Sequence, residues 1–402
     1  MRPRARAISL PPEQELLLAL VRGESGRDAW CTNDCGELWL QALGLAERHG
    51  VAPLLHAQAQ AGALPWLPEL ARRELRAARI AELSLEEKRA RALEAVLRIL
   101  SGSGAERCIP VLLLKGAASA RTLYAQPELR PRSDLDLLIA PDDRAEALAR
   151  LEAQGYAQHA MTRGTREDQP GWHERTLVHP ASPGQQLDLH FALAQAQRHR
   201  LDARALLAAS VREPALGAAA RLLPPAEATL VCAHSLAVHE LAAPLITLCD
   251  LARLLVRCDP ERLARLAREV RLGRALFVSL ALLERLSSRP ARAEAGVDGA
   301  DAKQGAQEDR ASHPAAAAVS LCGATVERAQ LEALAQRLAL SAPIERLLHG
   351  AAAGFDLSRR RLPRAHQLWR KALFIDRPGD AARFAARHLL ESVRLARRSR
   401  PR

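Results

Sequence analysis

The sequence predicts an α+β fold in which a small mixed β-sheet core is flanked by N-terminal and C-terminal helical regions. Helical periodicity dominates residues 1–104 and returns from residue 201, whereas the short alternating apolar segments of residues 105–200 are typical of strands. Ala and Leu dominate the composition and aromatic residues make up only 3% of the chain. We therefore expect aliphatic, mostly helical cores around the sheet.

The length and net charge of the chain limit the number of its domains and the kinds of partner that it can bind. A chain of 402 residues is long enough for two or three domains, each with its own core. The net charge of +12 is compatible with a polyanionic substrate or with nucleic acid. However, only four of the 58 basic residues are lysine, a skew that indicates genome composition more than selection for binding. The scarcity of aromatic residues also disfavours single-stranded nucleic acid as a partner.

Cysteines and apolar runs predict a cytoplasmic protein. The seven cysteines are odd in number and dispersed, which is typical of free thiols in a reducing compartment. The basic N-terminus lacks the apolar stretch of a signal peptide. No run approaches the roughly 18 apolar residues of a membrane span.

The N-terminal region, residues 1–104, is expected to be helical. Leu93, Val96, Leu97 and Leu100 recur at helical spacing, so one face of their helix should be buried. The opposite face is expected to be solvated, and its charged residues are Glu86, Glu87, Lys88, Arg89 and Arg91. The sequence Ser-Gly-Ser-Gly at residues 101–104 should end this helix.

The core, residues 105–200, should alternate strands and helices. Its predicted elements are a strand Cys108–Leu114, a helix Ala117–Leu123, a strand Leu135–Ile139, a helix from residues 141–143 to Gln154, and a hairpin of Thr176–His179 with Gln186–Phe191.

Two strands of this core carry acidic residues. Asp134 and Asp136 are two residues apart, so on a strand they face the same side. Adjacent carboxylates repel unless a cation lies between them, and the carboxylate ligands suit Mg²⁺ or Mn²⁺. Asp188 lies on a later alternating strand, with His190 on the same face. Three carboxylates could hold two metal ions for displacement at phosphorus. The alternative for the Asp pair is a solvated loop or a helix cap.

A phosphate-binding turn is expected beside these carboxylates. Gly116 precedes the start of a helix, whose free N–H groups attract phosphate, and it permits close backbone approach. Lys115 and Arg130 are candidates for neutralising phosphate charge, although a lysine at this place could be chance. Arg132 and Ser133 are further candidates, whose alternative is simply to form the turn before the strand.

These motifs resemble a known family. Leu113-Leu114-Lys115-Gly116, Leu129-Arg130-Pro131 and Ser133-Asp134-Leu135-Asp136 are similar to motifs of the uncharacterised nucleotidyltransferase family, which belongs to the DNA polymerase β-like superfamily. The resemblance covers most of residues 40–260 and implies a nucleotidyltransferase core at 105–200. Two departures are Phe191, where the family usually has Trp, and Lys115-Gly116-Ala117 in place of the superfamily's Gly-Ser or Gly-Gly turn.

The resemblance implies an enzyme that moves a nucleoside monophosphate from an NTP to a hydroxyl or similar acceptor and releases pyrophosphate. Asp134, Asp136 and Asp188 would be catalytic and hold the metal, with Asp188 as general base or metal ligand. The acceptor would be a small molecule, a peptide or a protein, with nucleic acid less favoured. One alternative is a catalytically inactive protein of the same fold that binds a nucleotide or partner. Another is a basic, helical nucleic-acid-binding protein. A Walker-type motif is absent from the sequence.

The C-terminal half is expected to be helical. Residues 201–288 should form a helical domain in which helical spacing brings His239 and Asp250 to similar faces. Related members carry His in this region, so His239, like His190, is a candidate for supporting the metal ligands; for each the alternative is a structural hydrogen bond. Residues 289–318 lack apolar periodicity and predict a flexible linker. Residues 319–402 should form a C-terminal helical region with a basic tail.

Overall fold

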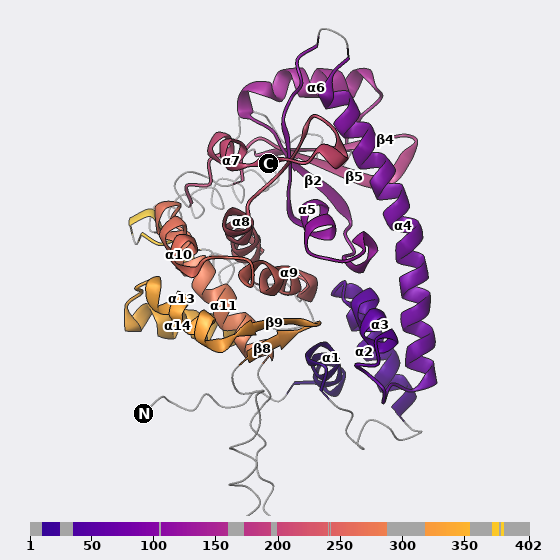
Figure 1. Cartoon of the computed structure of the whole chain (residues 1–402), viewed down its shortest axis with the longest axis vertical. Helices are drawn as coiled ribbons and strands as arrows, with labels where there is room; N and C mark the ends of the chain where they lie inside the picture. The colour runs from indigo at the N-terminus through magenta and orange to yellow at the C-terminus, as the bar shows by residue number, and fades with distance from the viewer. Residues whose placement is uncertain are drawn as a thin grey trace, which may run out of the picture.

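A mixed seven-stranded sheet with helices packed around it confirms the α+β prediction (Figure 1). The structure is a computed structural model. It describes residues 10–24, 35–103, 106–159, 173–193, 199–239, 241, 243–287, 318–353, 372–377 and 379–381.

The sheet has the strand order β3-β4-β5-β2-β1-β7-β6. Its strands are β1 (Val111–Leu113), β2 (Asp134–Leu138), β3 (Ala157–Gln158), β4 (Glu174–His179), β5 (Ser182–His190), β6 (Val211–Arg212) and β7 (Ala220–Leu222). β2 runs parallel to β5, and β1 runs parallel to β7, while the other neighbours are antiparallel. The predicted hairpin is thus confirmed as β4 and β5.

Alternation along β2 explains why its acidic residues share a face. Leu135 and Leu137 are buried and pack in one apolar cluster with Leu187 and Leu189 of β5. The same cluster contains Leu93 and other residues of α4 (Glu69–Ser101), which confirms the predicted buried face of that helix. Because strand side chains alternate, burying these leucines directs the intervening Asp residues to the other side of the sheet.

The N-terminal region is helical, as predicted. It comprises α1 (Pro12–Arg22), α2 (Gly36–Arg48), α3 (Ala52–Gln60) and α4, which runs along one side of the molecule (Figure 1). The expectation that the charged face of α4 is solvated is wrong for Glu86 and Arg89, which are both buried. Glu86 is bonded to the Arg132 guanidinium at 2.6 Å, and Arg89 is bonded to Glu82. The Glu86–Arg132 contact anchors α4 to the turn that precedes β2, whereas the Arg89–Glu82 contact lies within α4.

The core helices are α5 (Lys115–Thr122) and α6 (Arg144–Ala153), and short 3₁₀ turns at Pro127–Leu129 and Pro141–Asp143 precede β2 and α6. α5 begins directly after β1, two residues earlier than predicted. The predicted helix up to Gln154 corresponds to α6, which ends one residue before it.

Residues 201–288 are not helical throughout, in contrast to the prediction. The helices are α7 (Ala203–Ala209), α8 (Pro225–Val238), α9 (Leu245–Leu255), α10 (Pro260–Glu269) and α11 (Gly273–Ser287). Between α7 and α8, however, β6 and β7 extend the sheet past residue 200, and the Val111 N–H donates to the Ala219 carbonyl at 2.8 Å. Strands of two and three residues carry too little alternation to be recognised in a sequence.

The C-terminal region begins with a hairpin rather than a helix. β8 (Ala318–Leu321) pairs with β9 (Ala324–Glu327), and α13 (Arg328–Arg337) and α14 (Ala342–Ala353) follow. Leu331 and Leu334 are buried on α13, where a spacing of three residues places them on one helix face. The predicted linker, apart from Ala318, and most of the basic tail lie outside the described residues. Within the described ranges, no helix has the length and apolar character needed to cross a bilayer.

Candidate active site

The sheet register brings the three predicted aspartates together. β2 and β5 are parallel, and Asp136 is paired directly with Asp188, while Asp134 lies two residues earlier on β2. All three line one cavity of about 470 Å³, together with His190 and Lys115; we call it the carboxylate cavity. Side chains from α8 close the opposite wall of this cavity, among them His234 and Ser235.

Lys115 lies directly against the aspartates. Its ammonium nitrogen is 2.6 Å from Asp136 Oδ1. Burial lowers the pKa of Lys115, but the charge and hydrogen bond of Asp136, together with the charges of Asp134 and Glu174, outweigh this effect, so the pKa is raised overall. Lys115 has a φ of 41°, a left-handed conformation that is unfavourable for a residue with a Cβ. Local backbone strain of this kind persists where the surrounding contacts fix the residue, as the Asp136 ion pair does here.

His190 is held between two carboxylates. Its Nε2 is 2.8 Å from Asp136 Oδ1, and its Nδ1 is 3.0 Å from Glu174 Oε2. Burial opposes the charged ring, but the two carboxylates outweigh it and raise the pKa of His190 to about 9. A ring that gives a proton to each carboxylate is an imidazolium. The chain therefore supplies two cations to the same oxygen of Asp136.

Glu174 is a site residue that the sequence analysis missed. It is the first residue of β4, and the antiparallel register pairs it with His190. The hydrogen bond from His190 lowers the pKa of Glu174 and outweighs the effect of burial. The signal that could have identified Glu174 in the sequence is its position on the hairpin strand opposite His190.

The three aspartates differ in their electrostatics. Burial and the charge of Asp136 raise the pKa of Asp134. Burial acts in the same direction on Asp136, but the hydrogen bond from His190 and the charge of Lys115 lower its pKa well below the ordinary value. Burial raises the pKa of Asp188, although a hydrogen bond from Thr176 opposes it. Asp188 Oδ1 is buried without a hydrogen-bond partner in the structure.

The donor atoms of the cavity suit a hard divalent cation. Asp134, Asp136 and Asp188 supply carboxylate oxygens, which Mg²⁺ and Mn²⁺ prefer, and Asp188 Oδ1 is a buried acceptor without a partner. The three aspartates therefore fit a divalent cation in their ligand chemistry and in the strand register that pairs them. In the arrangement of the described residues, however, no three His, Cys, Asp or Glu side chains are grouped closely enough to hold a metal ion.

The other residues expected to face phosphate lie elsewhere. Arg130, Gly116 and Ser133 do not line the carboxylate cavity, and Ser133 is exposed. Arg130 is buried and its Nη2 is 2.7 Å from Asp250 Oδ2 on α9. A Cβ on Gly116 would lie 2.7 Å from Arg130 Nη1, so the glycine permits the close approach of this guanidinium. Lys115 is thus the member of this predicted set that lines the cavity.

His239 and Asp250 do not share a helix face, in contrast to the prediction. α8 ends at Val238, and Asp250 lies on the separate helix α9. His239 lines the carboxylate cavity at the end of α8, whereas Asp250 accepts hydrogen bonds from Arg130 and Tyr124. Pro244 precedes α9 and disfavours helical conformation in Ala243, which keeps the start of α9 separate from α8.

A mixed sheet that presents two aspartates on one strand and a third on its parallel neighbour is the arrangement that the sequence motifs predicted. The family model of the uncharacterised nucleotidyltransferases matches residues 36–288, which is well over half of the chain and contains the whole sheet. The chain therefore belongs to this family. No curated protein and no solved structure matches it.

Proposed function

We propose that the chain transfers a nucleoside monophosphate from an NTP to a hydroxyl acceptor in the carboxylate cavity and releases pyrophosphate. The observation that carries this proposal is the pairing of Asp136 with Asp188 in parallel strands, two residues from Asp134, within a domain of the nucleotidyltransferase family. The cavity of about 470 Å³ lies within the range of small-molecule sites.

The charges around the cavity support a role for a divalent cation. A triphosphate would meet four carboxylates, those of Asp134, Asp136, Glu174 and Asp188, so it needs added positive charge to bind. We propose Asp134, Asp136 and Asp188 as the residues that hold Mg²⁺ or Mn²⁺. Such a cation, when bound, neutralises phosphate charge and lowers the pKa of a coordinated hydroxyl.

Lys115 would act on the phosphates. Lys115 is the first residue of α5, and its ammonium forms an ion pair with Asp136. The side chain is 30% exposed, so a phosphate oxygen can reach it. Neighbouring carboxylates outweigh the effect of burial on its pKa and keep this amine positively charged. The N–H groups at the start of α5 would add to this attraction for an anion.

Asp188 is the proposed proton acceptor. Burial raises its pKa, and its Oδ1 has no hydrogen-bond partner in the structure. The acceptor oxygen would form a bond to the α-phosphorus while its proton passes to Asp188. The bond between the α-phosphorus and the bridging oxygen breaks, and pyrophosphate leaves with that electron pair. His190, fixed by Glu174, would hold Asp136 in position.

Turnover of labelled nucleotides tests this function. Each α-labelled NTP would be incubated with Mg²⁺ or Mn²⁺ and a metabolite and protein extract, because the acceptor is unidentified. We expect labelled product and pyrophosphate from the wild type, and neither from Asp134→Ala/Asp136→Ala. Asp142→Ala is a matched control, since Asp142 is exposed on the surface. Absence of turnover, with NTP binding that is equal in wild type and double variant, would favour a catalytically inactive nucleotide-binding protein.

A further inference from the structure

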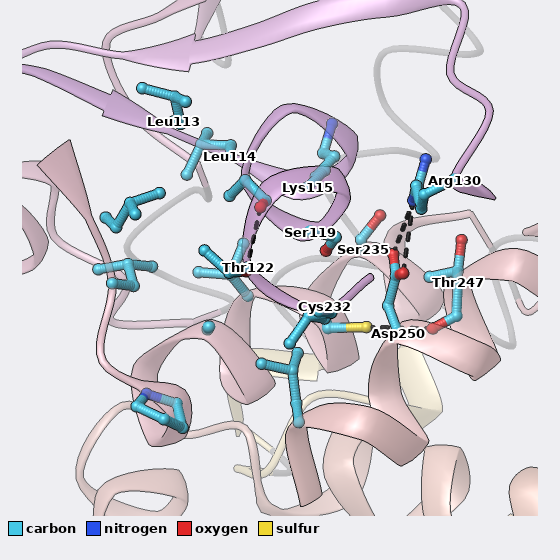
Figure 2. A pocket seen from close by; sticks show the side chains of 18 of the residues that line it. Leu113, Leu114, Lys115, Ser119, Thr122, Arg130, Cys232, Ser235, Thr247 and Asp250 are labelled. Atoms are coloured by element: carbon cyan, nitrogen blue, oxygen red, sulfur yellow. Dashed lines mark hydrogen bonds and ion pairs between the residues drawn. The ribbon is translucent and has the colours of Figure 1, made fainter. Parts of the chain in front are cut away.

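A second, smaller cavity lies on the other side of Lys115. It has a volume of about 170 Å³ and lies between α5, α8 and α9 (Figure 2). Much of its wall is aliphatic, and includes Leu113, Leu114, Leu222, Val231 and Leu254. Apolar walls of this kind favour the burial of an apolar group, by about 25 cal/mol for each Å² removed from water.

Two of the three cationic side chains on the wall of this cavity, Arg130 and Lys115, are paired with a carboxylate. Arg130 is bonded to Asp250 at 2.7 Å, and Arg257 donates to the Thr122 carbonyl at 2.6 Å. The Lys115 ammonium is bonded to Asp136, and in Figure 2 its nitrogen points away from Thr122. A cationic ligand would therefore lose its water without gaining a free carboxylate as counterion, which is strongly unfavourable.

The smaller cavity adjoins the carboxylate cavity. Lys115, Val231 and Ser235 line both of them, so the two share one wall of α5 and α8 residues. A group held in the smaller cavity with a short polar arm could extend past this shared wall toward Asp188. The larger cavity thus presents the carboxylates of Asp134, Asp136 and Asp188, whereas much of the wall of the smaller cavity is aliphatic.

We propose that the smaller cavity binds an uncharged, apolar part of the acceptor, about the size of one aromatic ring, and directs the acceptor hydroxyl toward the carboxylates. The inference rests on the proposed nucleotidyl transfer. The size of the bound group follows from the volume of the smaller cavity, since a dry apolar cavity of about 150 Å³ accommodates benzene. A nucleobase is a poorer occupant, because its ring nitrogens and exocyclic groups would be buried against aliphatic walls, at about 1–3 kcal/mol for each unsatisfied group.

Benzyl alcohol is a suitable probe, because it combines one ring with a hydroxyl on a short arm. Its binding to the full chain would be measured by ligand-observed NMR, with benzylammonium as a charged analogue. Ala118→Leu on α5 and Ala228→Leu on α8 would each fill part of the cavity. Ala90→Leu, at a half-buried helical position on α4 that lines neither cavity, is the matched control.

We expect benzyl alcohol to bind the wild type and Ala90→Leu equally, and to bind each cavity variant at least tenfold more weakly, while benzylammonium does not bind. With Mn²⁺ added, we expect the methylene protons of the bound probe to relax faster than the ring proton opposite the methylene, because they lie closer to the carboxylates. Unweakened binding in Ala118→Leu and Ala228→Leu, or displacement of the probe by adenosine, would overturn the inference.

The same samples separate this inference from the proposed function. If Mn²⁺ binds with NTP but the ring proton relaxes at least as fast as the methylene protons, the acceptor orientation is wrong and the proposed function stands. If the probe binds as expected but Mn²⁺ and NTP do not bind, the proposed function fails, and the assignment of the cavity to an acceptor fails with it.

Discussion

Removing Arg130 should destabilise the fold rather than weaken a phosphate contact. Its guanidinium makes two hydrogen bonds to Asp250 Oδ2, at 2.7 and 3.0 Å, and the Tyr124 hydroxyl donates to Asp250 Oδ1 at 2.7 Å. Both members of the ion pair are buried, with side chains 9% and 3% exposed. The pair joins the turn before β2 to α9, so it holds the helical part of the chain against the sheet.

The burial of the pair sets the expected magnitudes. Arg130→Met leaves the Asp250 carboxylate buried with Tyr124 as its remaining partner, so we expect a loss of about 3–5 kcal/mol in the free energy of unfolding. Asp250→Leu leaves an unpaired guanidinium and should cost a similar amount. The double variant removes both charges and leaves the Tyr124 hydroxyl without its partner, which costs about 1–3 kcal/mol. The double variant should therefore be more stable than either single variant.

Urea unfolding of the four proteins, followed by circular dichroism, measures these differences. The double variant should also keep its affinity for NTP with Mn²⁺, because Arg130 does not line the carboxylate cavity. Additive losses in the double variant would refute the claim that the pair is a buried structural unit. Normal stability of Arg130→Met together with weakened NTP binding would refute it as well, and would restore the phosphate role expected from the sequence.

Three further predictions concern single residues of the site. Gly116→Ala should destabilise the chain by about 1–3 kcal/mol in thermal unfolding, because the new Cβ would be 2.7 Å from a buried guanidinium nitrogen, whereas Gly184→Ala, with open space around it, should be nearly neutral. Glu174→Gln should lower the pKa of His190 by about one unit in an NMR titration, because one of its two carboxylate partners is lost. In the wild type the raised pKa means that protonation of His190 stabilises the fold fully below pH 6.5, and this contribution is lost as the pH rises through about 9. The variant should show a weaker loss of stability over that range. Asp188→Asn should lower turnover at least about 100-fold while the circular dichroism spectrum stays unchanged.

The sequence predicted the parts of the site that local pattern determines. Asp134, Asp136 and Asp188 were identified because each lies among leucines at strand spacing, and strand alternation then fixes the face to which they point. Lys115 was identified because it sits between a strand and a helix. These inferences need only a few neighbouring residues, and the helices before residue 104 follow from the same kind of local periodicity.

Long-range pairing decided what the sequence analysis missed. Glu86 looked like part of a solvated helix face, because nothing nearby in the sequence shows that Arg132 lies against it. Arg130 was expected at phosphate, yet its partner is 120 residues away in the chain. The strand Ala220–Leu222 escaped notice because its stability comes from pairing with β1 and not from its own three residues.

The fate of the phosphate groups tests the central claim most directly. The purified chain, once its acceptor is identified, would be incubated in parallel with α-labelled and γ-labelled NTP. Nucleotidyl transfer predicts that the α label joins the acceptor and that the γ label leaves in pyrophosphate, with both events lost in Asp134→Ala/Asp136→Ala. Transfer of the γ label to the acceptor, or its release as inorganic phosphate, would contradict the account, because the carboxylate cavity would then serve a kinase or an NTP hydrolase.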